Sequence, residues 1–165
     1  MIVSMRASIL QAEPAHPRLP VSVLMQRRRH ASAWQEWSFS VLQVLPAHVD
    51  TPLVEAPTEV QRHDGLEAAL FRDEAEGYYL NLSSGAPVWF VMWRQDDLDP
   101  SRAWPEMVTL SYHEAARWLD AQERVDNVPL DDAVAHWLAQ FTEAHYQPEP
   151  KQRRRPASFK APSQR

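Results

Sequence analysis

The sequence predicts an α+β domain, built as a mainly antiparallel sheet or a partly closed β-barrel of about six strands followed by two C-terminal helices. Short runs of alternating apolar and polar residues, separated by turn residues, fill the first two thirds of the chain. Two later segments repeat apolar side chains at helical spacing. The 165 residues include no Cys and only three Gly, which excludes disulfide frameworks, thiolate metal sites and glycine-rich phosphate loops.

The expected strands begin with Val21, Val23 and Met25, which alternate with polar residues, and a turn is expected over residues 27–32. A longer strand follows from Trp37 until Pro46 stops it. The run 88–93 is apolar on both faces and is expected to be the most buried strand. Asp64-Gly65 is a favoured tight-turn dipeptide and is expected to separate two short strands. The remaining strands are expected at 60–63, 66–72, 78–82 and 107–110.

The first helix is expected to open at Ser111 through a capping box. In that motif the Ser111 hydroxyl accepts a free backbone N–H, and Glu114 reaches back to the Ser111 N–H. Residues 122–129 are expected to be a connection. The second helix is expected from about 131 to 146, and its apolar stripe consists of Val134, Trp137, Leu138, Phe141 and His145.

One domain is expected over residues 20–150, between a flexible N-terminal extension (1–19) and a basic disordered tail (151–165). The tail holds six basic residues and no acid, which leaves 11 basic against 22 acidic residues in the rest of the chain. No apolar run approaches the roughly 18 residues of a membrane span. The absence of Cys and of a signal-peptide pattern leads us to expect a cytoplasmic protein.

Three blocks of the sequence occur in a recognisable order. The first block comprises residues 21–28, 34–37 and 44–46. The second comprises residues 71–78, 81–84 and 86–87, and the third comprises residues 108–120, 128–129 and 144–145. In these blocks the chain resembles, over about residues 20–150, the proteobacterial family known as domain of unknown function 3305.

The resemblance implies an accessory role. Genes of that family tend to lie beside those of molybdenum-dependent formate dehydrogenases and their maturation factors. The implied function is therefore assembly or regulation of such a molybdoenzyme system, and the implied partner is a molybdoenzyme subunit or a maturation factor. The resemblance supplies no cofactor and no catalytic residue.

The residues themselves indicate a protein that is not an enzyme, with no catalytic, cofactor-binding or metal-ligating residues. His113-Glu114 begins like the zinc-protease helix motif, but Arg117 stands where the second histidine ligand is required. The acidic clusters at 73–76 and 96–99 fall at expected turns, where solvated carboxylates are ordinary.

Arginine and tryptophan form the candidate interaction surface, because exposed Trp beside Arg is the composition of a binding hot spot. The alternative is that the arginines pack over tryptophan within the fold as cation–π pairs. The residues of the candidate surface are Arg27, Arg28, Arg29, Trp34, Trp104 and Trp118.

Two other functions stay open. A small-ligand or nucleotide-binding barrel would show a concave pocket lined by Trp or Tyr with a few converging arginines. The basic tail could instead bind nucleic acid or another anionic partner, although it carries a single aromatic residue and nucleic acid is not the expected partner. The basic residues considered for that role are Lys151, Arg153, Arg154, Arg155 and Lys160.

Overall fold

The computed structural model describes residues 16–50 and 59–150. Six strands and three α-helices are present, so the predicted α+β class is confirmed. The strands are β1 (Arg18–Arg29), β2 (Trp37–Pro46), β3 (Glu59–Ala69), β4 (Val88–Gln95), β5 (Ala103–Thr109) and β6 (Arg124–Pro129). The helices are the short 3-10 helix η1 (Arg72–Glu74), α1 (Ala75–Ser83), α2 (Tyr112–Asp120) and α3 (Asp132–His145).

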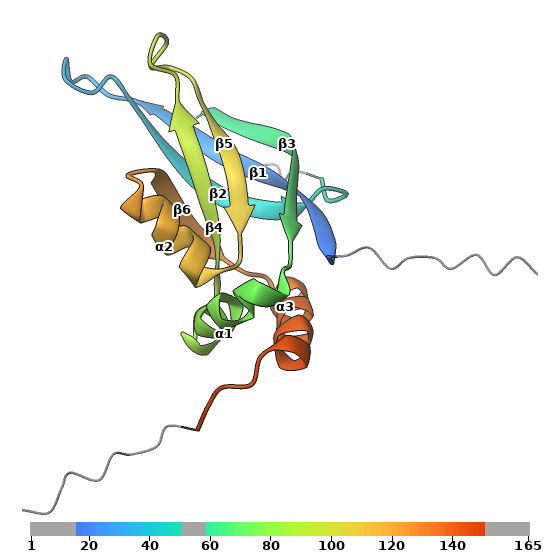
Figure 1. Ribbon diagram of the computed structural model, residues 1–165. Coiled ribbons are helices and arrows are strands. Elements are labelled where there is room, and N and C mark those ends of the chain that lie inside the picture. The colour runs from blue at the N-terminus through green and yellow to red at the C-terminus, as the bar shows by residue number, and fades with distance from the viewer. Residues whose placement is uncertain (1–15, 51–58, 151–165) are drawn as a thin grey trace, which may run out of the picture.

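The strands form two antiparallel three-stranded sheets, with orders β2-β1-β3 and β5-β4-β6 (Figure 1). The edge strand β3 contacts β5, and β2 contacts β6. No backbone ladder joins the two sheets among the described residues. The predicted antiparallel pairing is therefore confirmed, whereas the sheets stay open and the barrel alternative is not what forms.

The core lies between the two sheets. From β4 it takes Trp89, Val91 and Trp93; residues 89–93 are buried as expected, but 88–93 is not the most buried strand, because residues 21–25 of β1 are buried at least as fully. From β1 it takes Val21 and Val23, which are fully buried. Burying a large apolar side chain stabilises the fold by about 1.5–3 kcal/mol, so these positions account for much of the attraction between the sheets.

Both predicted C-terminal helices are present, with a correction at the first. The Ser111 hydroxyl accepts the Glu114 N–H at 3.2 Å, as expected. Glu114 does not reach back to the Ser111 N–H, because Thr109 intervenes: its hydroxyl donates to Glu114 at 2.5 Å and accepts the Ser111 N–H at 3.1 Å. At the second helix, Asp131 caps α3 by accepting the Val134 N–H at 2.8 Å.

The strand predicted at 78–82 is wrong, because these residues belong to helix α1. The buried positions Ala75, Tyr78 and Asn81 are three residues apart, which is a helical spacing. Asn81 is polar yet buried because its amide donates to the Val88 and Leu110 carbonyls and accepts the Val88 N–H. The described residues therefore form three α-helices, interleaved with the strands, instead of two after the last strand.

Two other local predictions are corrected. Asp64-Gly65 does not end a strand, because β3 runs through it. Gly65 has a φ of +87°, and the pairing of β1 with β3 shifts register between Val21 and Val23, which identifies a β-bulge. The connection predicted at 122–129 contains the edge strand β6, which pairs with β4.

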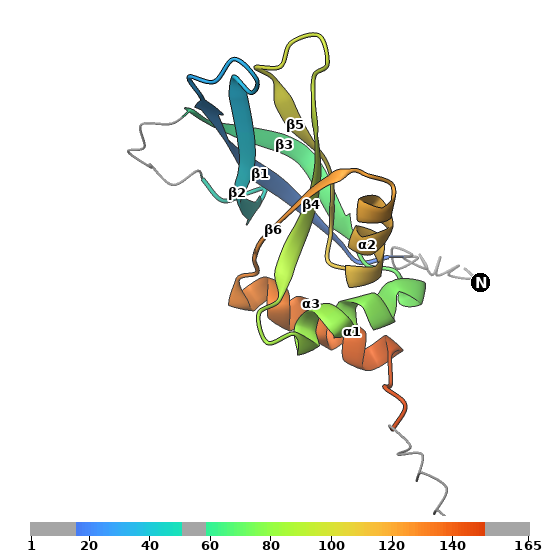
Figure 2. The same cartoon turned by 90° about the vertical axis from the view of Figure 1, so that its left-hand side faces the viewer.

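Figure 2 shows how these elements are arranged. Helices α1 and α3 lie together at one end of the sheets, and α2 lies beside β4. The loops that join β1 to β2 and β4 to β5 lie at the other end in both views. Within residues 16–50 and 59–150, no helix has the length and apolar character needed to cross a membrane.

Candidate interaction surface

The β1–β2 hairpin carries four of the six residues predicted to form an interaction surface. Arg27, Arg28 and Arg29 are the last residues of β1, and Trp34 lies in the loop that follows. The turn predicted at the three arginines is wrong, because they pair with β2 and Arg29 faces Trp37. Side chains alternate along a strand, so Arg27 and Arg29 share one face and Arg28 points to the other.

Two of the arginines are engaged within the fold. The guanidinium carbons of Arg27 and Arg29 lie 4.6 and 5.7 Å from the centre of the Trp37 ring. Arg29 also pairs with Glu36 at 2.9 Å. The intramolecular cation–π alternative therefore describes these two side chains, with Trp37 as the partner.

Trp34 and Arg28 face solvent. Trp34 is 98% exposed, and its backbone N–H donates to the Ser32 hydroxyl at 3.3 Å. Arg28 is exposed, and its side chain forms no hydrogen bond or ion pair with another residue of the described part of the chain. The hairpin thus presents an indole and an unpaired guanidinium to solvent. Binding of a partner could remove both from water, as happens to hot-spot side chains.

The other two tryptophans lie elsewhere. Trp104 is on β5, half-buried, and its indole N–H donates to Glu106 at 3.0 Å. Trp118 is half-buried on α2, which lies away from the hairpin tip in Figure 1. The structure thus groups the hairpin residues and does not bring Trp118 to them.

The tail residues proposed for an anionic partner lie outside the described residues. They are Lys151, Arg153, Arg154, Arg155 and Lys160.

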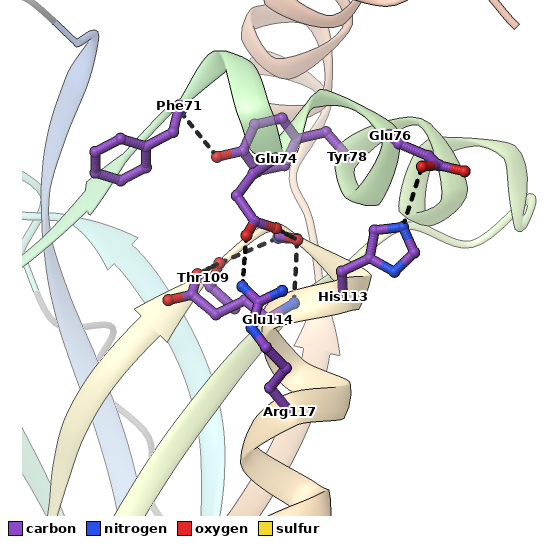
Figure 3. A network of polar contacts seen from close by, with 9 residues as sticks. Phe71, Glu74, Glu76, Tyr78, Thr109, His113, Glu114 and Arg117 are labelled. Atoms are coloured by element: carbon purple, nitrogen blue, oxygen red, sulfur yellow. Dashed lines mark hydrogen bonds and ion pairs between the residues drawn. The ribbon is translucent and has the colours of Figure 1, made fainter.

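A second group of polar side chains joins α1 to the start of α2 (Figure 3). The Ser111 hydroxyl and the Arg117 guanidinium both donate to the Glu74 carboxylate. Nearby, the His113 and Glu76 side chains approach to 3.7 Å. Gly77 permits the close approach, because a Cβ at that position would lie 2.2 Å from the Ser111 hydroxyl oxygen.

The pKa of Glu74 and the burial of Ser111 indicate that this cluster has a structural role. Burial acts to raise the pKa of the Glu74 carboxyl, but the hydrogen bonds from Ser111 and Arg117 outweigh it and hold the pKa below its ordinary value. A carboxylate held ionised by an arginine is a weak base. Ser111 is fully buried, so its hydroxyl is closed to a substrate. The cluster joins the start of α1 to the start of α2, and its serine hydroxyl is not accessible to solvent as a nucleophile.

One hollow of the described surface can be compared with the pocket that the small-ligand alternative requires. This hollow, of about 320 Å³, lies between the start of β1, the end of β2 and the start of α3, and is lined by Trp137, Arg18 and His48 among others. Arg18 is already paired with Glu67 at 2.9 Å, so several converging arginines are not found there. Within the described residues, no group of three or more His, Asp and Glu side chains is arranged to hold a metal ion.

The sequence prediction did not identify the exposure of Leu98. Leu98 lies in the β4–β5 loop and is 97% exposed. Its neighbours are polar, and a single leucine in an acidic loop carries no signal that separates solvent exposure from burial.

Comparison with known proteins identifies a family that the chain matches. A family model described as a protein of unknown function, DUF3305, matches residues 20–155. No curated protein and no solved structure matches the chain.

Proposed function

The chain belongs to the DUF3305 family of proteins of unknown function, and from that premise we propose that it is a non-enzymatic interaction protein. In this proposal it is a cytoplasmic accessory factor in the assembly or regulation of a molybdenum-dependent formate dehydrogenase system. Its partner is a molybdoenzyme subunit or a maturation factor.

The observation that carries the proposal is the exposure of both Trp34 and Arg28 on the β1–β2 hairpin. A tryptophan in solvent gains no packing energy in the free protein, whereas burial against a partner removes roughly 150–250 Å² from water. Trp and Arg are the residues most enriched at binding hot spots. Arg27 and Arg29 support the same region by lying over the Trp37 ring, a contact that joins β1, which presents Arg28, to β2.

Two further points support the proposal. The acid and hydroxyl side chains that meet between α1 and α2 are bonded to each other, so they serve the fold. The choice of a molybdoenzyme system as the partner rests on the family resemblance. Genes of that family tend to neighbour those of formate dehydrogenases.

Co-purification from the native host tests the proposal. The full-length chain with an affinity tag should recover a formate dehydrogenase subunit or one of its maturation factors under gentle conditions. Trp34→Ala should lower the recovery at least about tenfold, since hot-spot truncations cost 2 kcal/mol or more. The matched control is Leu119→Ala, which removes another exposed apolar side chain, 57% exposed on α2.

Both variants should retain wild-type thermal stability, because surface truncations change the free energy of unfolding by about 0.5 kcal/mol or less. Recovery of no molybdoenzyme component by the wild-type chain would overturn the assignment of the partner. Equal loss of recovery in Trp34→Ala and Leu119→Ala would remove the hairpin as the binding site.

A further inference from the structure

Leu98, on the β4–β5 loop, is exposed to nearly the same extent as Trp34 on the β1–β2 loop. The two side chains are the most exposed large hydrophobic residues of the described part of the chain, at 97% and 98%. Their loops join β4 to β5 and β1 to β2 and lie at the same end of the molecule in Figures 1 and 2. Two apolar anchors therefore stand at one end of the fold, opposite the end that holds α1 and α3.

The loop that carries Leu98 is held in shape by its own hydrogen bonds. The Asp96 carboxylate accepts the backbone N–H groups of Leu98 at 2.9 Å and of Asp99 at 3.2 Å. The Asp99 carboxylate accepts the N–H and hydroxyl of Ser101 at 3.1 and 2.6 Å, and the Gln95 amide donates to the Pro100 carbonyl at 2.8 Å. Leu98 is thus kept in solvent by a preorganised loop, which lowers the entropy cost of binding.

Arg27 connects this loop to the hairpin. Its guanidinium donates to the Ser101 carbonyl at 2.8 Å while it stacks on Trp37 and pairs with Glu59. Residues 74 positions apart in the sequence are therefore joined at the base of the two loops. The relative placement of the two anchors is set by the fold.

The two loops carry opposite charge. Residues 28–36 include two arginines and a histidine against one glutamate, whereas residues 96–102 include three aspartates against one arginine. Among these, Arg28 and Asp97 are exposed, and their side chains form no hydrogen bond or ion pair with other described residues. An anionic membrane or a nucleic acid presents one sign of charge and would be repelled by the aspartate loop.

We propose that Trp34 and Leu98 are two anchors of a single docking surface for one protein partner, which places an acidic segment opposite Arg28 and a basic segment opposite Asp97. This inference rests on the proposed function and adds to it the second loop and the chemistry of the partner. Apolar anchors supply the affinity, and the opposed charges fix the orientation of the partner.

Photo-crosslinking in host cells tests the two anchors. The chain carries p-benzoylphenylalanine at position 34, at position 98, or at the control position 140, an exposed glutamine on α3 at the other end of the molecule. Positions 34 and 98 should crosslink the same polypeptide, through an acid-rich peptide at 34 and a base-rich peptide at 98. Position 140 should not crosslink it.

Charge reversal tests the orientation, with the crosslinked polypeptide purified as the binding probe. Arg28→Glu and Asp97→Lys change the net charge by equal and opposite amounts. Each should weaken binding about three- to tenfold, and the double variant should weaken it further. Leu98→Ala should weaken binding about tenfold without lowering thermal stability, because Leu98 packs against nothing in the free protein.

The outcomes separate this inference from the proposed function. A crosslink from 34 alone, or different polypeptides from 34 and 98, overturns the two-anchor surface and leaves the hairpin as an interaction site. No crosslink above the position 140 control overturns both. Charge reversals with opposite effects that cancel in the double variant would indicate net-charge attraction and overturn the orientation. Binding of the chain to phosphatidylcholine–phosphatidylglycerol vesicles or to DNA that requires Trp34 and Leu98 overturns the commitment to a protein.

Discussion

The carboxylate of Asp126 accepts a hydrogen bond from the backbone N–H of Val41 at 2.9 Å. Asp126 is on β6 and Val41 is on β2, so this bond crosses the boundary between the two sheets. A backbone N–H at a sheet edge is a donor without a ladder partner, and a buried unpaired donor is costly. The Asp126 side chain thus supplies, at this point, the acceptor that a backbone hydrogen-bond ladder between β2 and β6 would otherwise provide.

Removing that acceptor should loosen the boundary. Asp126→Ala is expected to lower the free energy of unfolding by about 1–3 kcal/mol, because the Val41 N–H loses its partner in a part-buried position. Hydrogen exchange of the Val41 amide should accelerate. Asp126→Asn retains a carbonyl acceptor and should lose less. The exposed Asp97→Ala is the control, and equal losses in Asp126→Ala and Asp97→Ala would contradict the prediction.

The contact between α1 and the start of α2 should make two positions interdependent. Gly77→Ala is expected to destabilise the protein by about 1–3 kcal/mol, although alanine favours a helix, because its Cβ would lie 2.2 Å from the Ser111 hydroxyl oxygen. In a Ser111→Ala background the same change should cost less, since the clashing oxygen is gone. Chemical denaturation of the four proteins measures the coupling, and additive losses would argue against the close packing.

The stability of the protein should depend on pH through Glu74. The hydrogen bonds from Ser111 and Arg117 lower the pKa of its carboxyl in the folded state below the ordinary value of 4.5. The folded state therefore favours the ionised form, so the stabilisation is present above pH 4.5 and is lost as the pH falls through the lowered pKa.

The variant Glu74→Gln isolates that contribution. The difference in unfolding free energy between wild type and Glu74→Gln should be largest above pH 4.5 and should shrink in acid. A difference that stays constant from neutral pH into acid would refute the role assigned to Glu74.

Tyr78 should resist ionisation and contribute through its hydroxyl. Burial raises the pKa of Tyr78 to about 12, and the hydroxyl oxygen accepts the Phe71 N–H at 3.0 Å. Tyr78→Phe should lower the free energy of unfolding by about 1–3 kcal/mol, because the Phe71 N–H loses its acceptor. In an ultraviolet titration, wild type and Tyr78→Phe should differ only near pH 12. A difference already present near pH 10 would place the hydroxyl in solvent.

The sequence predicted the elements whose burial follows a simple period. Strand β4 is apolar over residues 88–93, and α3 begins at a capping aspartate before an apolar stripe, so both were recoverable from the residues alone. Helix α1 was not, since Tyr78, Leu80 and Leu82 alternate like a strand. Its true period includes Asn81, a polar residue buried by three hydrogen bonds that only the folded chain supplies.

The candidate surface divides in the same way. The exposure of Trp34 followed from its place between two strands. The sequence offered cation–π packing of the arginines as an alternative but could not identify Trp37 as the partner, because that depends on the register that sets Arg29 opposite Trp37. Leu98 was missed because its exposure comes from a loop held by Asp96 and Asp99, and periodicity contains no information about such bonds.

Arg27 sets a limit on which amino acids its position accepts. Its planar guanidinium serves the Ser101 carbonyl, the Glu59 carboxylate and the Trp37 ring together. A lysine ammonium is a point charge on a flexible stem and cannot present a flat fork to two acceptors while lying on an aromatic face. Replacing Arg27 by another positively charged residue is therefore not enough to keep these contacts. The shape of the side chain, more than its charge, decides which amino acids fit at this position.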